Sequence, residues 1–250
     1  MKAIGLDLWE TLITNTPEVA RVQQTHRVNA MERVLIERRM AHDQERLHRA
    51  YRESWDLCQE RYWSADLDIP CRRQIEHFLE LLAIEVDDAT IAELEDVYAN
   101  AILAELPIVV DGAYDVLREL RERGMRVGLI SNTGRTPGSA LREVLARLDI
   151  APSIDVMLFS NEHGECKPRP SIFKLLHESL GVTPEEMVFV GDNLYVDVYG
   201  AQQSGMKGIH FIPPQRGTAI APPVDHGLTI VADATIRDLR ELPTAIASLR

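Results

Sequence analysis

This 250-residue chain lacks the cysteine and histidine spacings that are typical of disulfide-rich folds and metal sites. Its three cysteines, Cys58, Cys71 and Cys166, are odd in number and include no CxxC pair. A disulfide-stabilised fold and a cysteine zinc site are therefore not expected, and a reducing cytosol fits best. The eight histidines show no HExxH spacing, so a histidine-rich metal site is not expected either.

Long apolar runs and an excess of positive charge are also lacking. No uninterrupted apolar run approaches about 18 residues, the length of a membrane span, and Asp7 and Glu10 precede any signal-peptide core. We therefore expect a soluble cytoplasmic protein with no membrane partner. The chain has 27 basic and 39 acidic residues, a net charge of −12 and no basic stripe, so no nucleic-acid partner is expected.

The composition is that of a globular protein. Apolar residues make up 45% of the chain and charged residues 26%, which excludes disorder as the main state. At about 150 residues per domain, the length predicts one large domain or one domain with a sizeable insert.

The segment from Pro17 to Ala104 contains no glycine and is rich in Arg, Glu, Gln and His, which indicates helices. The expected helices cover about 17–40, 43–63, 71–83 and 88–104. Aromatic residues at helical spacings, such as Tyr51 and Trp55, predict a packed helix face. The arginines between 33 and 49, and Arg72 with Arg73, could reach an anionic substrate.

Strand and helix patterns alternate through the rest of the chain. Strands are predicted at 2–8, 125–131, 155–159, 187–191, 207–212 and 228–231, and helices at 112–123, 138–148, 170–180, 195–204 and 235–248. The stretch 213–227 has the Pro and Gly content of a surface loop. This alternation predicts an α/β fold with a doubly wound parallel sheet.

Polar side chains follow the predicted strands, where open α/β sheets bind their ligands. They are Asp7 with Thr11, Ser131 with Asn132, then Lys167, Asp192 and Asp197. Asp7 can attack an electrophilic phosphorus or carbon and form a covalent aspartyl intermediate. Asp7 and Asp192 could hold Mg²⁺, and Lys167 would add a second positive charge. Ser131 and nearby backbone N–H groups could then bind phosphoryl oxygens.

Four motifs in order resemble those of the haloacid dehalogenase superfamily: LDLWETL (6–12), GLISN (128–132), KPRPSIF (167–173) and VGDNLYVD (190–197). The resemblance extends over essentially the whole chain. It implies a Rossmann-like hydrolase core formed by residues 1–14 and 106–250, and an inserted helical cap formed by residues 15–105.

The resemblance also implies roles for single residues. Asp7 would be the nucleophile, Thr11 and Ser131 would orient it and the substrate, Lys167 would neutralise charge, and Asp192 with Asp197 would build the Mg²⁺ site. Family phosphatases usually carry a second Asp, the general acid and base, two residues after the nucleophile. Trp9 stands there, and indole cannot exchange that proton at neutral pH.

Three hypotheses follow from Trp9. In the favoured one, the protein is a Mg²⁺-dependent phosphatase of a small phosphorylated metabolite. The Trp9 backbone carbonyl still binds the metal, and only protonation of the leaving group is lost. Glu10 or an acid of the cap could partly replace the missing acid. Alternatively the chain is a metal-independent 2-haloacid dehalogenase, a branch that carries an aromatic residue here, although Asp192 would repel its carboxylate substrate. The third hypothesis is a binding or regulatory member.

Further expectations concern the substrate and the assembly. The partner should be a small anionic molecule. Trp9, Asn132 and Arg135 lie near the predicted pocket and are candidate substrate contacts. The chain could be a monomer or a homodimer.

Overall fold

A parallel six-stranded sheet forms the centre of the computed structural model, which describes residues 1–40, 43–214 and 227–249. The strand order is β5-β4-β1-β6-β7-β8, and all neighbours run parallel. The strands are β1 (Ala3–Leu6), β4 (Arg126–Ser131), β5 (Val156–Phe159), β6 (Met187–Gly191), β7 (Lys207–Phe211) and β8 (Ala234–Ile236). The predicted α/β fold class is therefore confirmed.

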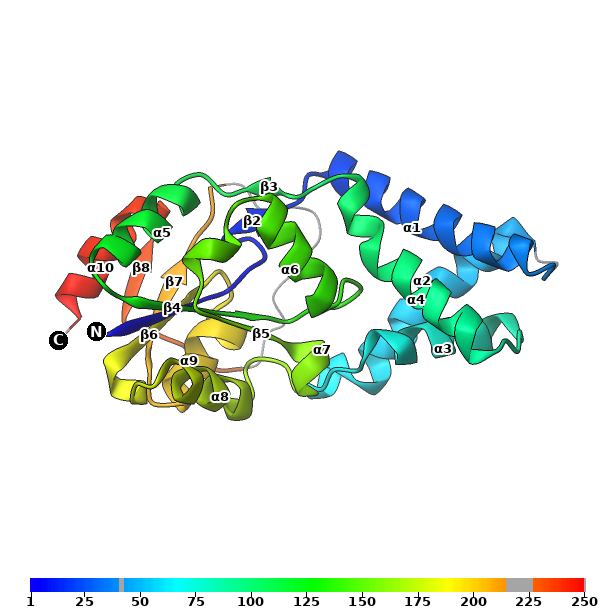
Figure 1. Ribbon diagram of the computed structural model, residues 1–250. Coiled ribbons are helices and arrows are strands. Elements are labelled where there is room, and N and C mark those ends of the chain that lie inside the picture. Colours follow the sequence, from blue (N-terminus) through cyan, green and yellow to red (C-terminus); the bar gives the residue numbers. More distant parts are fainter. Residues whose placement is uncertain (41–42, 215–226, 250) are drawn as a thin grey trace.

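Helices cover both faces of this sheet (Figure 1). One face carries α5 (Ala113–Glu122), α6 (Gly138–Arg147) and α10 (Leu242–Ser248), and the other carries α8 (Pro170–Leu180) and α9 (Gly200–Gln203). Two glycines let α8 lie close to the sheet. A Cβ added at Gly5 would lie 2.9 Å from the Leu176 side chain, and a Cβ added at Gly128 would lie 2.6 Å from it. Larger residues at these positions would push the helix outward.

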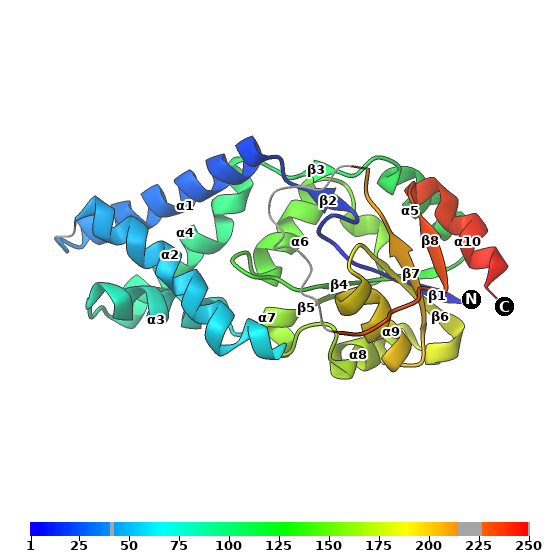
Figure 2. The ribbon, with the colours of Figure 1, turned by 180° about the vertical axis from the view of Figure 1, so that it is seen from behind.

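The predicted helical segment lies beyond the carboxyl ends of the strands (Figures 1 and 2). It contains α1 (Pro17–Glu37), α2 (Gln44–Arg61), α3 (Cys71–Leu82) and α4 (Asp88–Asn100), with short 3₁₀ turns at Trp63–Ala65 and Ala101–Ala104. Thr16 accepts from the Val19 N–H and caps α1, with Pro17 as its first residue. The four helices begin and end close to the predicted bounds.

A two-stranded antiparallel sheet joins the helical segment to the parallel sheet. It pairs β2 (Ile13–Thr14) with β3 (Ile108–Val109). The segment that leads into the helices and the segment that leads back to the parallel sheet are thus hydrogen-bonded to each other. Each strand is only two residues long, too short to give an alternation of apolar and polar residues in the sequence.

Two predictions near the C-terminus are wrong. The strand expected at 228–231 is absent, and β8 is formed by Ala234–Ile236 instead. Leu228 and Val231 are exposed, whereas the Asp233 carboxylate accepts from the Gly208 N–H and aligns the following residues with β7. The helix expected from 235 begins only at Leu242, after β8 and a 3₁₀ turn capped by Asp238.

Two other predictions concern neighbouring segments. The helix expected at 195–204 is divided into a π-helix, Leu194–Tyr199, and α9. Most of the loop predicted at 213–227 lies outside the described residues. Among the described helices, none combines the length and apolarity needed to cross a bilayer.

The three thiols are all free and buried. Burial raises the pKa of Cys58 to about 11 and the pKa values of Cys71 and Cys166 to about 12. Because the thiolate is the reactive form, native protein should react with an aromatic disulfide reagent at neutral pH far more slowly than a free thiol. In denaturant all three thiols should be exposed and react rapidly with the reagent. Fast labelling of the native protein would contradict this burial.

Candidate active site

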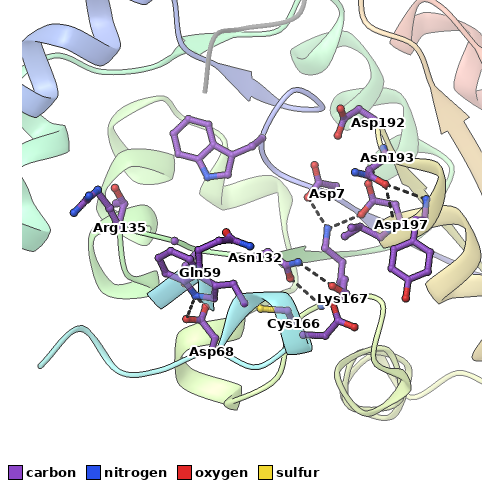
Figure 3. A pocket seen from close by; sticks show the side chains of 18 of the residues that line it. Asp7, Gln59, Asp68, Asn132, Arg135, Cys166, Lys167, Asp192, Asn193 and Asp197 are labelled. Atoms are coloured by element: carbon purple, nitrogen blue, oxygen red, sulfur yellow. Dashed lines mark hydrogen bonds and ion pairs between the residues drawn. The ribbon is translucent and has the colours of Figure 1, made fainter. Parts of the chain in front are cut away.

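A cavity of about 1320 Å³ lies between the carboxyl ends of the strands and the helical segment, and residues of both line it. Seven of the nine predicted site residues line this cavity: Asp7, Trp9, Asn132, Arg135, Lys167, Asp192 and Asp197. The other two, Thr11 and Ser131, are completely buried beside it. Figure 3 shows Asp7, Asp192, Asp197 and Lys167 gathered on one side of the cavity.

Lys167 connects two of the acids. Its Nζ lies 2.6 Å from Asp7 Oδ1 and 2.7 Å from Asp197 Oδ1, and only 1% of the side chain is exposed. Burial alone would lower the pKa of Lys167, but attraction to Asp197 and Asp7 outweighs burial and holds the pKa above its usual value. The lysine therefore remains charged in the site.

Asp7 experiences two opposing effects. Burial raises its pKa to about 6, and the neighbouring Lys167 limits the rise. Thr11 Oγ1 donates to Asp7 Oδ2 over 3.1 Å, so the carboxylate is held at both oxygens. An oriented carboxylate at the end of a central strand suits nucleophilic attack on a substrate in the cavity.

Three carboxylates converge closely enough to bind a metal ion. One oxygen each from Asp7, Asp192 and Asp197 lies within 4.8 Å of the other two. Asp197 is held by the Asn193 N–H, which donates to Oδ2 over 3.0 Å. It packs over Gly191, where a Cβ would come within 2.2 Å of the carboxylate. With Lys167, the four groups carry a net charge of −2, which fits a divalent cation with oxygen ligands.

Asn132 holds the main chain at Lys167. Its Nδ2 donates to the Lys167 carbonyl over 3.0 Å, and its Oδ1 accepts from the Lys167 N–H over 2.9 Å. The Asn132 amide therefore bonds to the Lys167 main chain, and the residue also lines the cavity. Ser131 Oγ donates to the Asn132 carbonyl over 3.3 Å and does not line the cavity. Both side chains are hydrogen-bonded to the main chain around the site.

Trp9 lies at the cavity, whereas the neighbouring Glu10 does not. Trp9 is half-buried and lines the cavity. Glu10 adopts a φ of 60°, is 1% exposed, and accepts from Thr14 Oγ1 over 2.8 Å outside the cavity lining. This geometry does not place Glu10 where it could replace the missing acid. The helical segment contributes three other acids to the lining: Asp56, Asp66 and Asp68.

Asp68 joins the two parts of the molecule, a role that the sequence did not reveal. Its Oδ1 accepts from Trp63 Nε1 and the Ile69 N–H, each over 2.8 Å. Its Oδ2 accepts from Thr133 Oγ1 over 2.9 Å and from Ser160 Oγ over 2.5 Å. The sequence predicts only the helix at 71–83 in this region, because the partners of Asp68 are 65 and 92 residues away.

The main chain reinforces this connection. The Asp68 N–H donates to the Gly164 carbonyl over 3.0 Å, and the Cys166 N–H donates to the Asp66 carbonyl over 2.9 Å. Leu67 and Glu165 form an isolated β-bridge between these segments. The helical segment is therefore attached to the loop that leads into Lys167.

The loop after β4 enters the helical segment. The Arg135 guanidinium lies 3.8 Å above the centre of the Tyr51 ring and donates to the Tyr51 carbonyl over 2.7 Å. The expectation of a packed aromatic face at Tyr51 therefore describes only part of its role. Arg27 on α1 also lines the cavity and was not singled out among the arginines. Its position on a regular helix gave no signal in the sequence.

Comparison with known proteins identifies the family. The family model described as haloacid dehalogenase-like hydrolase matches residues 1–205. A glyceraldehyde 3-phosphate phosphatase of Pyrococcus furiosus is 31% identical over 216 residues, covering 84% of this chain and 80% of the relative. A ribulose-1,5-bisphosphate 5-phosphatase of Halopiger xanaduensis is 32% identical over 154 residues, covering 62% of this chain and 63% of the relative.

Solved structures share the fold along the whole chain. A 2-haloacid dehalogenase from Pseudomonas syringae has a TM-score of 0.67 at 24% identity, covering 99% of this chain and 98% of the other. A phosphatase from Thermococcus onnurineus has a TM-score of 0.59, also at 24% identity, covering 100% of this chain and 99% of the other. The model match over four-fifths of the sequence and the shared fold agree, and the chain belongs to the haloacid dehalogenase-like hydrolase family.

Proposed function

We propose that this protein is a Mg²⁺-dependent phosphatase that hydrolyses a small phosphorylated molecule through an aspartyl-phosphate on Asp7. The observation that carries the proposal is the convergence of Asp7, Asp192 and Asp197 around Lys167. The relatives named as phosphatases support it. In this proposal residues 15–105 form a cap over a catalytic core made of residues 1–14 and 106–250.

The arrangement of charges favours a phosphatase over a dehalogenase. Three carboxylates outnumber the one lysine among these four groups, so the site repels the carboxylate of a 2-haloacid. A divalent cation held by Asp7, Asp192, Asp197 and the Trp9 carbonyl would neutralise this excess of negative charge. Mg²⁺ would supply electrostatic stabilisation of a phosphoryl group as its charge redistributes.

The residues of the chain have separate tasks in this reaction. An Asp7 oxygen attacks phosphorus, the bond from phosphorus to the ester oxygen breaks, and the leaving group departs with the bonding electrons. Lys167 balances the negative charge beside Asp7, and Thr11 holds the nucleophile in place. Water then hydrolyses the aspartyl-phosphate, releasing inorganic phosphate and restoring Asp7. Because Trp9 cannot protonate the leaving group, aryl and acyl phosphates should react faster than alkyl phosphates.

Turnover of three compounds tests this function. p-Nitrophenyl phosphate, acetyl phosphate and 2-chloropropionate would be incubated with the protein in Mg²⁺ and in excess EDTA. We expect phosphate release in Mg²⁺, its loss in EDTA, and no chloride release in either condition. Chloride release that is insensitive to EDTA would establish the dehalogenase alternative instead.

A further inference from the structure

Two arginines lie together beside the cavity, on the part of its wall formed by the helical segment and the loop after β4. Arg27 comes from α1 and Arg135 from the loop. Both contact the same two tyrosines. Arg27 Nη1 lies 3.4 Å from Tyr51 Oη and its Cζ lies 5.0 Å from the centre of the Tyr98 ring. Arg135 stacks on Tyr51 and lies 3.4 Å from Tyr98 Oη.

The other hydrogen bonds of these guanidiniums also go to neutral oxygens. Arg27 donates to the Tyr98 carbonyl over 2.8 Å and to Thr136 Oγ1 over 3.1 Å. Arg135 donates to the Tyr51 carbonyl over 2.7 Å. Within the described ranges neither arginine forms an ion pair with a carboxylate. Two cations are therefore held close together without a counter-charge.

Three weakly acidic groups beside the arginines, Tyr98, Cys58 and Cys71, cannot supply that counter-charge at neutral pH. Burial raises the pKa of Tyr98 above its usual value, so its hydroxyl stays protonated. The pKa of Cys58, which interacts with Arg135, is raised by burial to about 11, and that of Cys71, which interacts with Arg27, to about 12. Buried charges in proteins are normally paired, so this arrangement lacks an anion.

Arg135 retains unused donors and lies at the cavity. A guanidinium has five N–H donors, and only two nitrogens of Arg135 have a hydrogen-bonded partner. Both arginines line the cavity that contains Asp7. Figure 3 shows Arg135 on the opposite side of this cavity from Asp7 and Asp192. A molecule whose phosphoryl group lies at Asp7 could therefore extend towards the arginines.

We propose that Arg27 and Arg135 bind a second anionic group of the substrate, a carboxylate or a phosphate, at the end remote from the scissile phosphoryl group. This assignment rests on the phosphatase function proposed above and names its substrate class. The substrate is a small molecule with two anionic groups, a phosphoryl group at one end and another oxyanion at the other. A planar guanidinium pairs with either oxyanion through two parallel hydrogen bonds.

Matched pairs of esters test the proposal. 3-Phosphoglycerate and glycerol 3-phosphate differ by a carboxylate in place of a hydroxymethyl group. Propane-1,3-diol bisphosphate and 3-hydroxypropyl phosphate differ by the second phosphate. We expect the member with the second anionic group to be preferred about 100-fold in kcat/KM in at least one pair, mainly through KM. The pair that shows the preference identifies the oxyanion, and no preference in either pair would overturn the proposal.

Variants then test which residues cause the preference. Arg135→Gln and Arg27→Gln should each reduce the preference to below about 10-fold. Arg135→Lys keeps the charge but loses the planar stack on Tyr51, so it should retain more of the preference than Arg135→Gln. Arg21→Gln, an exposed change on the same helix as Arg27, should leave the preference unchanged. Equal losses in Arg135→Lys and Arg135→Gln would indicate a purely structural role.

Binding without turnover separates this proposal from the proposed function. Titration calorimetry with Asp7→Asn should show tighter binding of 3-phosphoglycerate or the bisphosphate than of the matched monophosphate that lacks the second oxyanion, and Arg135→Gln should remove the difference. If the protein hydrolyses no phosphate ester but shows this difference, the phosphatase function fails and the anion site stands. If it hydrolyses p-nitrophenyl phosphate but binds both members of each pair equally, the anion site fails.

Discussion

Replacing Asp7 by Asn should abolish phosphate release, with a fall in kcat of at least about 10⁴-fold. The amide oxygen keeps an acceptor near Lys167 and Thr11, but an amide cannot form the covalent phosphoenzyme. Single-turnover and steady-state assays with p-nitrophenyl phosphate would measure the loss. Asp88→Asn, an exposed change at the start of α4, is the matched control and should retain full activity.

The loss in Asp7→Asn should not arise from unfolding. The pKa of Asp7 is raised by burial from 3.8 to about 6. A carboxyl with a higher pKa in the folded state makes the protein less stable as the pH rises through this interval, because ionisation is easier in the unfolded chain. At neutral pH the substitution removes that penalty, so the thermal midpoint without metal should not fall. Full activity in Asp7→Asn would exclude the proposed mechanism.

Replacing Trp9 by Asp should raise turnover of alkyl phosphates by about 10²- to 10⁴-fold, the usual contribution of general acid–base catalysis. The rise should be much smaller for aryl and acyl phosphates, whose leaving groups need little protonation. The measurement is kcat for 3-hydroxypropyl phosphate, p-nitrophenyl phosphate and acetyl phosphate in parallel.

Trp9→Asn is the matched control for this experiment. It creates the same space in the cavity and retains the backbone carbonyl, but it cannot donate the proton. If Trp9→Asp and Trp9→Asn change all three rates alike, the effect comes from the size of the cavity. The missing acid would then not explain the leaving-group preference.

The sequence was most informative where local pattern and function coincide. Strands such as β1 and β6 are short apolar runs followed by Asp7 and Asp192, so both the sheet and the convergence of its acids could be predicted. The helical segment was recognisable because it lacks glycine and is rich in Arg, Glu, Gln and His. These features depend on neighbours within a few positions.

Features that depend on distant partners could not be predicted. β8 was misplaced because the apolar run at 228–231 suggested a strand, whereas pairing with β7 is determined by Asp233 through the Gly208 N–H. Arg27 resembled any other helix arginine until the fold placed it against Tyr98 and Thr136. The two hydrogen bonds between the Asn132 side chain and the Lys167 main chain could not be predicted either, because they span 35 residues.

The attachment of Asp66 and Asp68 to the loop before Lys167 has a consequence for the timing of catalysis. Any swing of the helical segment away from the sheet must break the bonds from Cys166 to Asp66 and from Thr133 and Ser160 to Asp68, or carry the loop with it. Cys166 is the residue before Lys167, so the lysine would lose its alignment in the same movement. Opening for substrate entry or product release would therefore move Lys167 away from Asp7, and the reaction could proceed only in the closed molecule.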